Sequence, residues 1–176
     1  MLLFRITSLR FCFFRAPSHL IRNMEIMTPL NLPPFEAKIK ETEENKLSIY
    51  DTLRRKYIAL TPEEWVRQHF INYLINYKGY PEALLANEMA ISLNGTTKRC
   101  DSVLFSPQMQ PRMILEYKAP HINISQKVFD QITRYNMVLH VEYLIVSNGL
   151  HHYCCKIDIK ENRYTFLQDI PAYQNL

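Results

Sequence analysis

The stretch Cys100–Lys118, which reads C-D-S-V-L-F-S-P-Q-M-Q-P-R-M-I-L-E-Y-K, decides the fold of this chain. It begins with a strand-like run that contains Asp101, continues through a proline-bounded turn at 106–111, and ends in a second strand-like run that closes on Glu116-Tyr117-Lys118. Because side chains alternate between the two faces of a strand, Glu116 and Lys118 project to the same side. Pairing of the two runs as a β-hairpin would bring Asp101 beside Glu116.

This arrangement is suited to metal-dependent chemistry. Two carboxylates that converge on one point could bind a hard divalent cation, and Mg²⁺ prefers oxygen ligands completed by water and substrate phosphate. The ammonium group of Lys118 could stabilise a phosphate in the transition state or help to deprotonate a metal-bound water. The alternative interpretation is a salt bridge at the end of a strand, where acidic and basic residues two positions apart are common.

The composition is that of one globular domain. The chain has 176 residues, enough to bury a core, and its 47% hydrophobic residues and three glycines favour folding over disorder. The four cysteines (Cys12, Cys100, Cys154 and Cys155) show no C-x-x-C spacing, which predicts a reducing compartment and strand packing for the adjacent pair. The sequence contains no phosphate-cradling glycine loop and no G-x-S-x-G elbow, which argues against NTPase and serine hydrolase chemistry.

Residues 1–26 differ in kind from the rest, and we expect a disordered arm or an over-extended start there, with 27–176 as the single domain. Four arginines among the phenylalanines of this segment interrupt any apolar run long enough to span a membrane. They are Arg5, Arg10, Arg15 and Arg22. Without them 17 basic residues face 17 acidic ones, so the net charge of +4 belongs to residues 1–23 and the rest of the chain, 24–176, is neutral. Net charge therefore gives no argument for binding DNA.

The residues after this segment predict an extended arm and then two short strands. Prolines crowd the stretch Met27–Pro34, which suits an extended chain. Strand-like residues then lie on either side of the stretch Asp51–Lys56. The triplet Arg54-Arg55-Lys56 could contact a phosphate, but we favour a solvated loop.

The segment Thr61-Pro62-Glu63-Glu64 predicts the start of a helix. Threonine is suited to the N-cap, proline to the first helical position, and Glu64 to the capping-box position. Apolar residues continue at helical spacing to Ile75, and the helix should end before Gly79. Glu64 has two interpretations, as a capping-box carboxylate or as an accessory acid of the site.

A strand is predicted at Leu84–Leu93, followed by a hairpin turn at Asn94-Gly95. Glu88 lies inside this apolar run, where a charge is costly unless it is paired or bound to a metal. We therefore take Glu88 as a candidate metal ligand, with a solvent-facing glutamate on an edge strand as the alternative. The neighbouring pair Lys98-Arg99 should be exposed near the turn, where it could meet a phosphate backbone.

An amphipathic helix is predicted from Ser125 to about His140. Gln131 and Tyr135 lie four residues apart on one face of it. The apolar stretch Glu142–Ser147 has the composition of a strand buried on both faces.

Further strands are predicted at 151–156 and 164–167. His151 and His152 would point to opposite faces of a strand, so we interpret them as structural. The expected order is helix, strand, strand-turn-strand, helix, strand and a C-terminal β appendage. This order predicts an α/β fold with a mixed central sheet flanked by helices.

The set Asp101, Glu116-x-Lys118 and Gln131-x-x-x-Tyr135 resembles the PD-(D/E)xK nuclease superfamily. It is most similar to the subgroup that includes RecB-type nucleases and the N-terminal domain of type I restriction enzyme R subunits. Cys100 stands where the pattern has proline. The resemblance covers about residues 30–172 and implies the restriction-endonuclease-like αβββαβ core of that superfamily.

The resemblance also implies a Mg²⁺-dependent DNA endonuclease, with Mn²⁺ as a substitute, in the cytoplasm of a bacterium. Asp101 and Glu116, with Glu88, would hold the metal, and Lys118 would assist the attacking water. Gln131 and Tyr135 would shape the site. The partners would be DNA and other restriction or defence subunits, with no membrane. R subunits carry a helicase motor after this domain, and because this sequence shows none, ATP-driven translocation is not expected.

Two alternatives stay open. A non-catalytic DNA- or protein-binding module could retain the same fold, and the neutral body favours it. A nuclease that acts on RNA is the other, since the same metal chemistry can hydrolyse either backbone.

Overall fold

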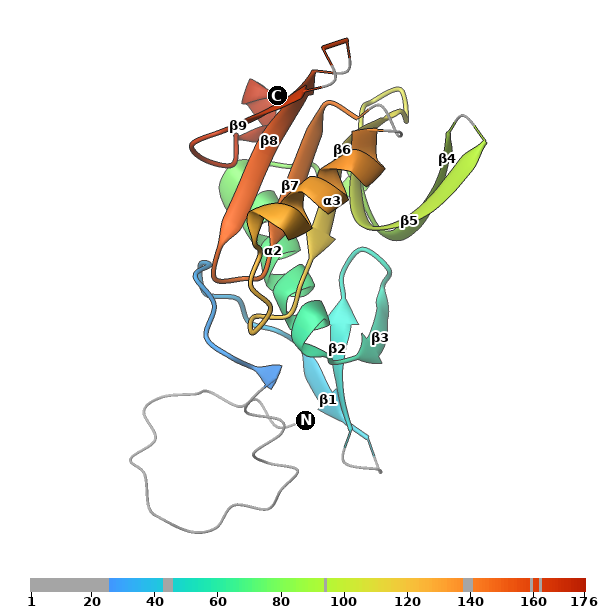
Figure 1. The fold of residues 1–176 in the computed structure, drawn as a ribbon. Coiled ribbons are helices and arrows are strands. Elements are labelled where there is room, and N and C mark those ends of the chain that lie inside the picture. The colour runs from blue at the N-terminus through green and yellow to red at the C-terminus, as the bar shows by residue number, and fades with distance from the viewer. Residues whose placement is uncertain (1–25, 43–45, 94, 138–140, 159, 162) are drawn as a thin grey trace.

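The computed structural model describes residues 26–42, 46–93, 95–137, 141–158, 160–161 and 163–176 (Figure 1). Side chains within some of these elements, including those of Gln131 and Tyr135, lie outside the described part. The segment 1–25 also lies outside it, so the expectation for the N-terminal arm stays a prediction. The described residues form a mixed α/β structure, as predicted, with one three-stranded and one six-stranded sheet.

The small sheet precedes the first long helix. Its antiparallel strands are β1 (Ile39–Glu41), β2 (Leu47–Asp51) and β3 (Lys56–Ala59). The predicted pair of strands on either side of the turn at 52–55 is therefore confirmed. In Figure 1 this sheet lies beside the N-terminal end of helix α2.

Helix α2 (Pro62–Lys78) begins and ends where the sequence predicts. The Thr61 hydroxyl accepts a hydrogen bond from the Glu64 backbone N–H at 3.1 Å, and Pro62 occupies the first helical position. Gly79 ends the helix in the left-handed conformation (φ 72°), which a residue without Cβ adopts at little cost.

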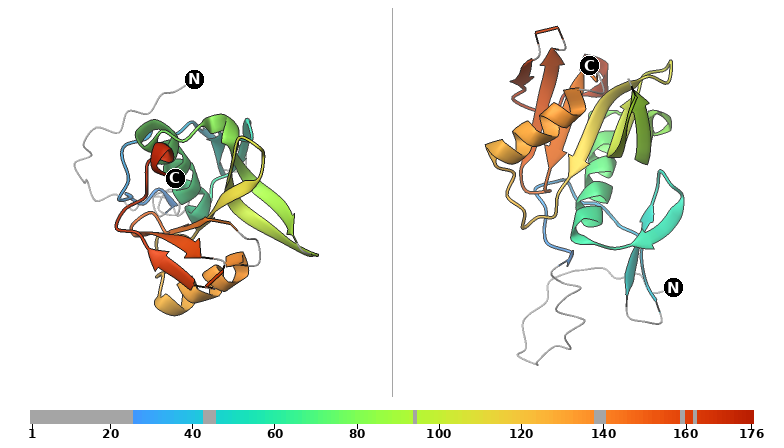
Figure 2. Two further views of the ribbon diagram at one scale, coloured as in Figure 1. Left: turned by 90° about the horizontal axis from the view of Figure 1, so that it is seen from above. Right: turned by 45° about the vertical axis from the view of Figure 1, so that its right-hand side comes forward.

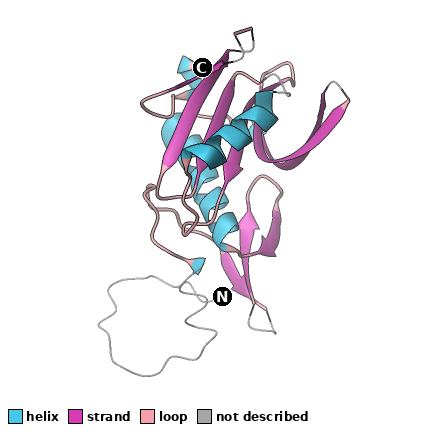
Figure 3. Cartoon of the chain, in the orientation of Figure 1, coloured by secondary structure: helices cyan, strands magenta, loops and turns pink. Residues whose placement is uncertain are grey.

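The large sheet has the strand order β4-β5-β6-β7-β8-β9, and all neighbours are antiparallel except β6 and β7 (Figure 3). Helix α3 (Gln126–Met137) makes the crossover between that parallel pair. The strands are β4 (Leu85–Leu93), β5 (Thr96–Phe105), β6 (Pro111–Tyr117), β7 (Tyr143–Ser147), β8 (His152–Asp158) and β9 (Arg163–Phe166). Short 3-10 helices lie at Glu82–Leu84 and Tyr173–Asn175.

The predicted C-terminal strands extend this same sheet instead of forming a separate layer. The predicted hairpin between β4 and β5 is present, with Leu93 paired to Thr96, while the turn residue Asn94 lies outside the described part. All five residues of β7 are buried, as expected for a strand covered on both faces.

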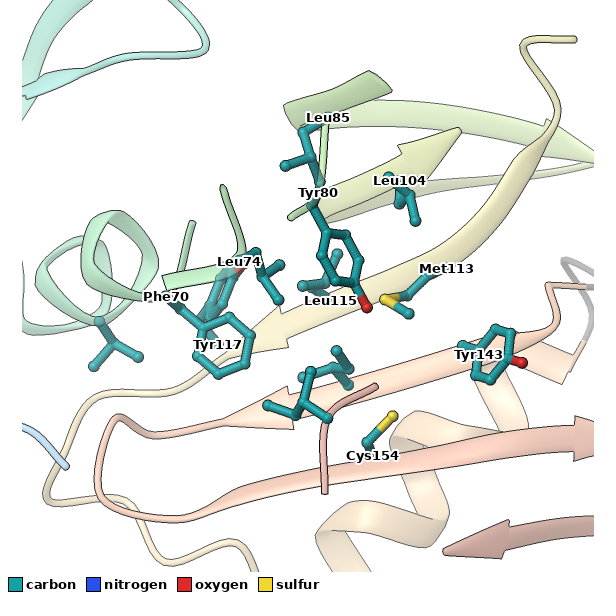
Figure 4. Packing of buried hydrophobic residues seen from close by; sticks show 13 residues of the cluster. Phe70, Leu74, Tyr80, Leu85, Leu104, Met113, Leu115, Tyr117, Tyr143 and Cys154 are labelled. Atoms are coloured by element: carbon teal, nitrogen blue, oxygen red, sulfur yellow. The ribbon is translucent and has the colours of Figure 1, made fainter. Parts of the chain in front are cut away.

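The two long helices pack on opposite faces of the large sheet (Figure 2). On one face, Phe70 and Leu74 of α2 pack against strand residues that include Leu115 and Tyr117 (Figure 4). On the other face, Phe129 of α3 packs against a second cluster that includes Leu144. Burying both faces in this way removes a large apolar area from water and fixes the sheet on which the site is built.

The turn after β7 packs against the extended segment 27–34, which follows the undescribed N-terminus. Gly149 has φ 82°, and a Cβ at this position would lie 2.6 Å from Leu30 Cδ2 and 3.0 Å from Val66 Cγ2. The Asn31 backbone N–H donates to the Gly149 carbonyl at 2.8 Å. His152 lies close by, with one ring nitrogen 2.8 Å from Ser147 Oγ and the other 3.0 Å from the Asn31 carbonyl, so its role here is structural.

The cysteines in the described part, Cys100, Cys154 and Cys155, are buried free thiols. Burial raises the pKa of Cys154 and of Cys155 to about 12, so both stay protonated and pack as small apolar side chains. None of the helices within the described residues is both long enough and apolar enough to span a membrane.

Candidate functional site

Strands β5 and β6 pair as the hairpin that the sequence predicts. Ser102 lies opposite Leu115 in the ladder, and Asp101 and Glu116 are the next residues on the two strands. The Tyr117 backbone N–H donates to Asp101 Oδ2 at 2.9 Å, which fixes that carboxylate at the end of β6. Lys118 follows at once, and its backbone N–H donates to the Ser147 carbonyl at 2.9 Å, so it lies where β6 and β7 both end.

Arg67 of α2 reaches this hairpin end from the helix. Its side chain is only 4% exposed, and its guanidinium contacts Asp101 Oδ1 at 2.9 Å, Glu88 Oε1 at 2.8 Å and Glu64 Oε2 at 2.7 Å. Burial lowers the pKa of Arg67, but these three carboxylates outweigh burial and raise it, so the guanidinium stays charged. One cation therefore connects three acidic side chains from α2, β4 and β5.

Glu88 reaches Arg67 through an unusual backbone. Its φ is 57°, a left-handed conformation that is uncommon for residues other than glycine. The register is the same on both sides, with Asn87 opposite Ser102 and Met89 opposite Cys100, so no residue is inserted in the strand. Glu88 itself departs from the ladder, and it pairs with both Arg67 and Arg99. Glu88 is therefore a paired glutamate on the outer strand β4 whose side chain is 21% exposed, and its role as a metal ligand stays a prediction.

Glu64 is held by more than its place at the helix start. Its carboxylate accepts from Gln68 Nε2 at 2.8 Å and from Arg54 Nη2 at 3.4 Å, in addition to Arg67. Burial raises the pKa of Glu64, and Arg67 and Gln68 act in the opposite direction. The expected capping-box position is confirmed by the hydrogen bond from the Glu64 backbone N–H to Thr61. The Glu64 carboxylate, however, binds Arg54, Arg67 and Gln68.

Glu63, the neighbour of Glu64, is a further candidate for the site that was missed from the sequence. Burial raises the pKa of Glu63, the charges of Asp101 and Glu116 raise it further, and Lys118 and Arg67 act in the opposite direction. Glu63 therefore titrates under the influence of the predicted site residues, which makes it a candidate member of the site. A helix turns about 100° per residue, so the first two glutamates of α2 face different surroundings.

A second polar network supports the site from the small sheet. The buried carboxylate of Asp51 accepts from Asn87 Nδ2 at 2.9 Å and from the Arg54 backbone N–H at 2.9 Å, and it pairs with the Arg54 side chain. Ser102 Oγ donates to Asn87 Oδ1 at 2.6 Å, which links the small sheet to β5 beside Asp101. Burial raises the pKa of Asp51, but these hydrogen bonds outweigh it and the pKa falls below its ordinary value. The prediction of a solvated loop is therefore wrong for Arg54.

A hollow of about 480 Å³ is lined by Thr28, Pro62, Pro120, His121 and Leu150. Two of these residues are close in sequence to the site, since Pro62 precedes Glu63 and Pro120 follows Lys118 by two residues. The lining includes none of the predicted site residues themselves.

Other expectations for the site remain predictions. Gln131 and Tyr135 belong to α3, but their side chains lie outside the described part. Arg99 is 73% exposed, as expected, and pairs with Glu88, while the side chain of Lys98 is not described. Within the described ranges, no cluster of three or more histidine, cysteine, aspartate or glutamate side chains has the geometry of a metal centre.

The fold and the site together define a mixed α/β protein whose polar site lies at the ends of the central strands, where carboxylates meet a lysine and a buried arginine. The chain belongs to the family of the type I restriction enzyme R protein N terminus (HSDR_N), whose model matches residues 62–171. The match includes α2 and the whole of the large sheet, and therefore every residue predicted for the site.

One similar solved structure is the fragment described as "a putative HsdR subunit of a type I restriction enzyme from Vibrio vulnificus YJ016". The identity is 16% and the TM-score 0.46. The match covers 62% of this chain and 23% of that chain. No curated protein matches the chain significantly.

Proposed function

We propose that this protein is a Mg²⁺-dependent nuclease that hydrolyses phosphodiester bonds of DNA. The observation that supports this proposal is the hydrogen bond from the Tyr117 backbone N–H to Asp101 Oδ2 at 2.9 Å, because Tyr117 stands between Glu116 and Lys118 at the end of β6. Membership of the R-protein family supports it. We further propose that the order α2, β4, β5, β6, α3 and β7 is the αβββαβ core of the PD-(D/E)xK superfamily.

The charge of the site is suited to a divalent cation. Ten charged side chains are joined by the contacts and electrostatic couplings given above: Asp51, Glu63, Glu64, Glu88, Asp101, Glu116, Arg54, Arg67, Arg99 and Lys118. Six are carboxylates and four are cations, so this set carries a formal charge of −2 when all are ionised. Carboxylate oxygens are the ligands that Mg²⁺ prefers, and Mn²⁺ accepts similar ones.

Each residue has a role in this proposal. Asp101 and Glu116, with Glu88, would hold the metal, whose chemistry is to activate water and to neutralise the developing charge on phosphate. Asp101 keeps lone pairs for this role, because a carboxylate offers about four acceptor sites and Arg67 and Tyr117 take two of them. Lys118 would orient the attacking water, and Gln131 and Tyr135 would position the substrate.

A second candidate is a non-catalytic module that keeps the family fold and binds DNA or a protein. The observation that favours it is the pairing of Arg67 with Asp101 and Glu88, because it neutralises two of the carboxylates assigned to the metal.

Cleavage assays with matched variants test the proposal. Supercoiled plasmid, linear duplex, single-stranded DNA and RNA would be incubated with Mg²⁺ or Mn²⁺ and the wild-type chain, Asp101→Asn, Glu116→Gln or Lys118→Met. We expect each substitution to lower the cleavage rate by about 10²-fold or more, because each removes a group that acts on the reacting phosphate or water.

Asp158→Asn serves as the control, since Asp158 pairs with Arg163 at 3.9 Å on the far hairpin of β8 and β9 and should leave cleavage unchanged. Circular dichroism would establish that all variants fold. Cleavage by Asp101→Asn at the wild-type rate would reject the nuclease assignment and favour the binding module.

A further inference from the structure

Arg67 holds its carboxylates by only part of its guanidinium. The Nη1 and Nη2 groups make the contacts with Glu64, Glu88 and Asp101, whereas Nε is buried and has no hydrogen-bond partner among the described residues. Buried polar groups without a partner are rare and costly in folded proteins. Among the residues that the structure describes, Arg67 is the one cation that contacts all three carboxylates, yet its own hydrogen bonding is incomplete.

Arg67 also draws on the carboxylates assigned to the metal. Asp101 Oδ1 accepts from Arg67 Nη2, and Glu88 Oε1 pairs with Arg67 Nη1. A guanidinium and a divalent cation have charge of the same sign, and repulsion between like charges is strong where water is largely excluded. The side chain of Arg67 is 4% exposed and that of Asp101 is 19% exposed, so solvent screens little of it.

We propose that Arg67 and a divalent cation compete for Asp101. Arg67 is then a positioning residue, which holds the carboxylates of α2, β4 and β5 together in the metal-free protein and lowers their affinity for the metal. This inference rests on the nuclease function proposed above and adds a means of regulation to the same site. It predicts that removing the arginine lowers the stability of the metal-free protein and raises its affinity for the metal. A purely structural arginine would not produce this combination.

Calorimetric titration of the full chain with Mn²⁺ tests this competition. We expect Arg67→Met to bind Mn²⁺ about tenfold or more tightly than the wild type, because a like charge beside Asp101 is removed. Arg67→Lys keeps the charge and should stay within about threefold of the wild type. In thermal melting without metal, Arg67→Met should have a lower Tm than the wild type. Added Mn²⁺ should raise the Tm of Arg67→Met by more than it raises the Tm of the wild type.

Arg99→Met is the matched control. Arg99 pairs with the other oxygen of Glu88 but is 73% exposed and does not contact Asp101. Loss of this exposed charge should change Mn²⁺ affinity by less than about threefold, because solvent screens it. A gain in Arg99→Met equal to that in Arg67→Met would overturn the inference, since total charge would then explain the effect.

The outcomes separate the inference from the function on which it rests. Suppose that the wild type binds Mn²⁺, that Asp101→Asn does not, and that Arg67→Met binds Mn²⁺ no more tightly than the wild type. The inference is then wrong and the nuclease function stands. If no variant binds Mn²⁺, with or without uncleavable DNA, both are overturned. Should Arg67→Met be unfolded without metal, refolding by Mn²⁺ that fails when Asp101→Asn is added supports the competition, and no refolding rejects it.

Discussion

Glu63 and Glu64 are neighbours in the sequence, yet their carboxylates have different surroundings in the structure. Glu64 is fastened to Arg54, Arg67 and Gln68, whereas Glu63 is coupled to Asp101, Glu116 and Lys118. Glu63 is partly buried, and a partly buried carboxylate whose pKa is raised by other carboxylates destabilises the folded protein; such groups are typical of functional sites. Glu63 is therefore the glutamate of α2 that we expect to matter for activity.

Glu63→Gln should lower cleavage and Mn²⁺ affinity while raising the stability of the folded protein. The pKa of Glu63 is raised above its unfolded value, so the ionised carboxylate costs stability at neutral pH, and glutamine removes that cost. The stabilisation should be present at pH 7 and vanish as the pH falls below the unfolded value of about 4.3. Urea unfolding from pH 7 to pH 4 measures it.

Glu82→Gln is the control for this pair of effects, because Glu82 is exposed in the 3-10 helix beyond the other end of α2. It should change neither cleavage nor stability. A Glu63→Gln variant that is less stable than the wild type at pH 7 would contradict the placement of Glu63 among the acidic side chains.

Residue roles were harder to predict than residue types. The spacing of Asp101, Glu116 and Lys118 indicates a hairpin site directly, because strand alternation and pairing are local rules. The capping-box pattern gave Glu64 a sufficient explanation and drew attention away from Glu63. Arg67 resembles any helical arginine in the sequence, and its partners Glu88 and Asp101 come from strands that only the tertiary fold brings to it.

At the scale of elements, the turn after β7 depends on glycine for two separate reasons. Gly149 has a left-handed backbone, and its missing Cβ leaves room for Leu30 and Val66. Gly79 has a similar backbone (φ 72°) but nothing within 4 Å of the position of its Cβ. The two glycines therefore separate the cost of conformation from the cost of crowding.

Gly79→Ala should destabilise the protein by about 1 kcal/mol, the cost of a left-handed alanine. Gly149→Ala should cost about 2–4 kcal/mol, because crowding against Leu30 and the buried Val66 adds to that term. Equilibrium unfolding in urea compares the two. Equal losses of stability in the two variants would show that Leu30 and the segment 27–34 around it move aside without cost.

The boundaries of most elements follow from chemistry that the sequence shows. Thr61 and Gly79 cap α2, Gly95 belongs to the β4–β5 hairpin turn, and the apolar run of β7 is buried on both faces. The attachment of β8 and β9 to the large sheet could not be predicted in the same way. Strand order depends on which strands pair in the folded protein, and the local sequence preference for β-structure does not determine this.

At the scale of the whole molecule, charge is divided unevenly along the chain. The segment 1–23 contains Arg5, Arg10, Arg15 and Arg22, and the remainder is neutral. Two arginines of the body, Arg54 and Arg67, pair with buried carboxylates of the protein itself. Electrostatic attraction to a phosphate backbone should therefore come largely from the N-terminal segment.

Replacing these four arginines by glutamine should weaken non-specific binding to duplex DNA. The slope of log affinity against log salt should fall by about 0.9 for each arginine that contacts a phosphate. Fluorescence anisotropy over a salt series measures both. A matched variant that loses four lysines of the small sheet region, Lys38, Lys40, Lys46 and Lys56, controls for total charge, and an equal loss in it would contradict the assignment.

The left-handed backbone of Glu88 has a consequence for association between molecules. β4 is an outer strand of the large sheet, and such strands are templates for β-pairing with other chains, which leads to aggregation. An added strand would need a continuous extended ladder, and at Glu88 the ladder is broken and a charged side chain stands beside it. The residue that carries a carboxylate to Arg67 thus also protects this edge of the protein from its neighbours in a crowded solution.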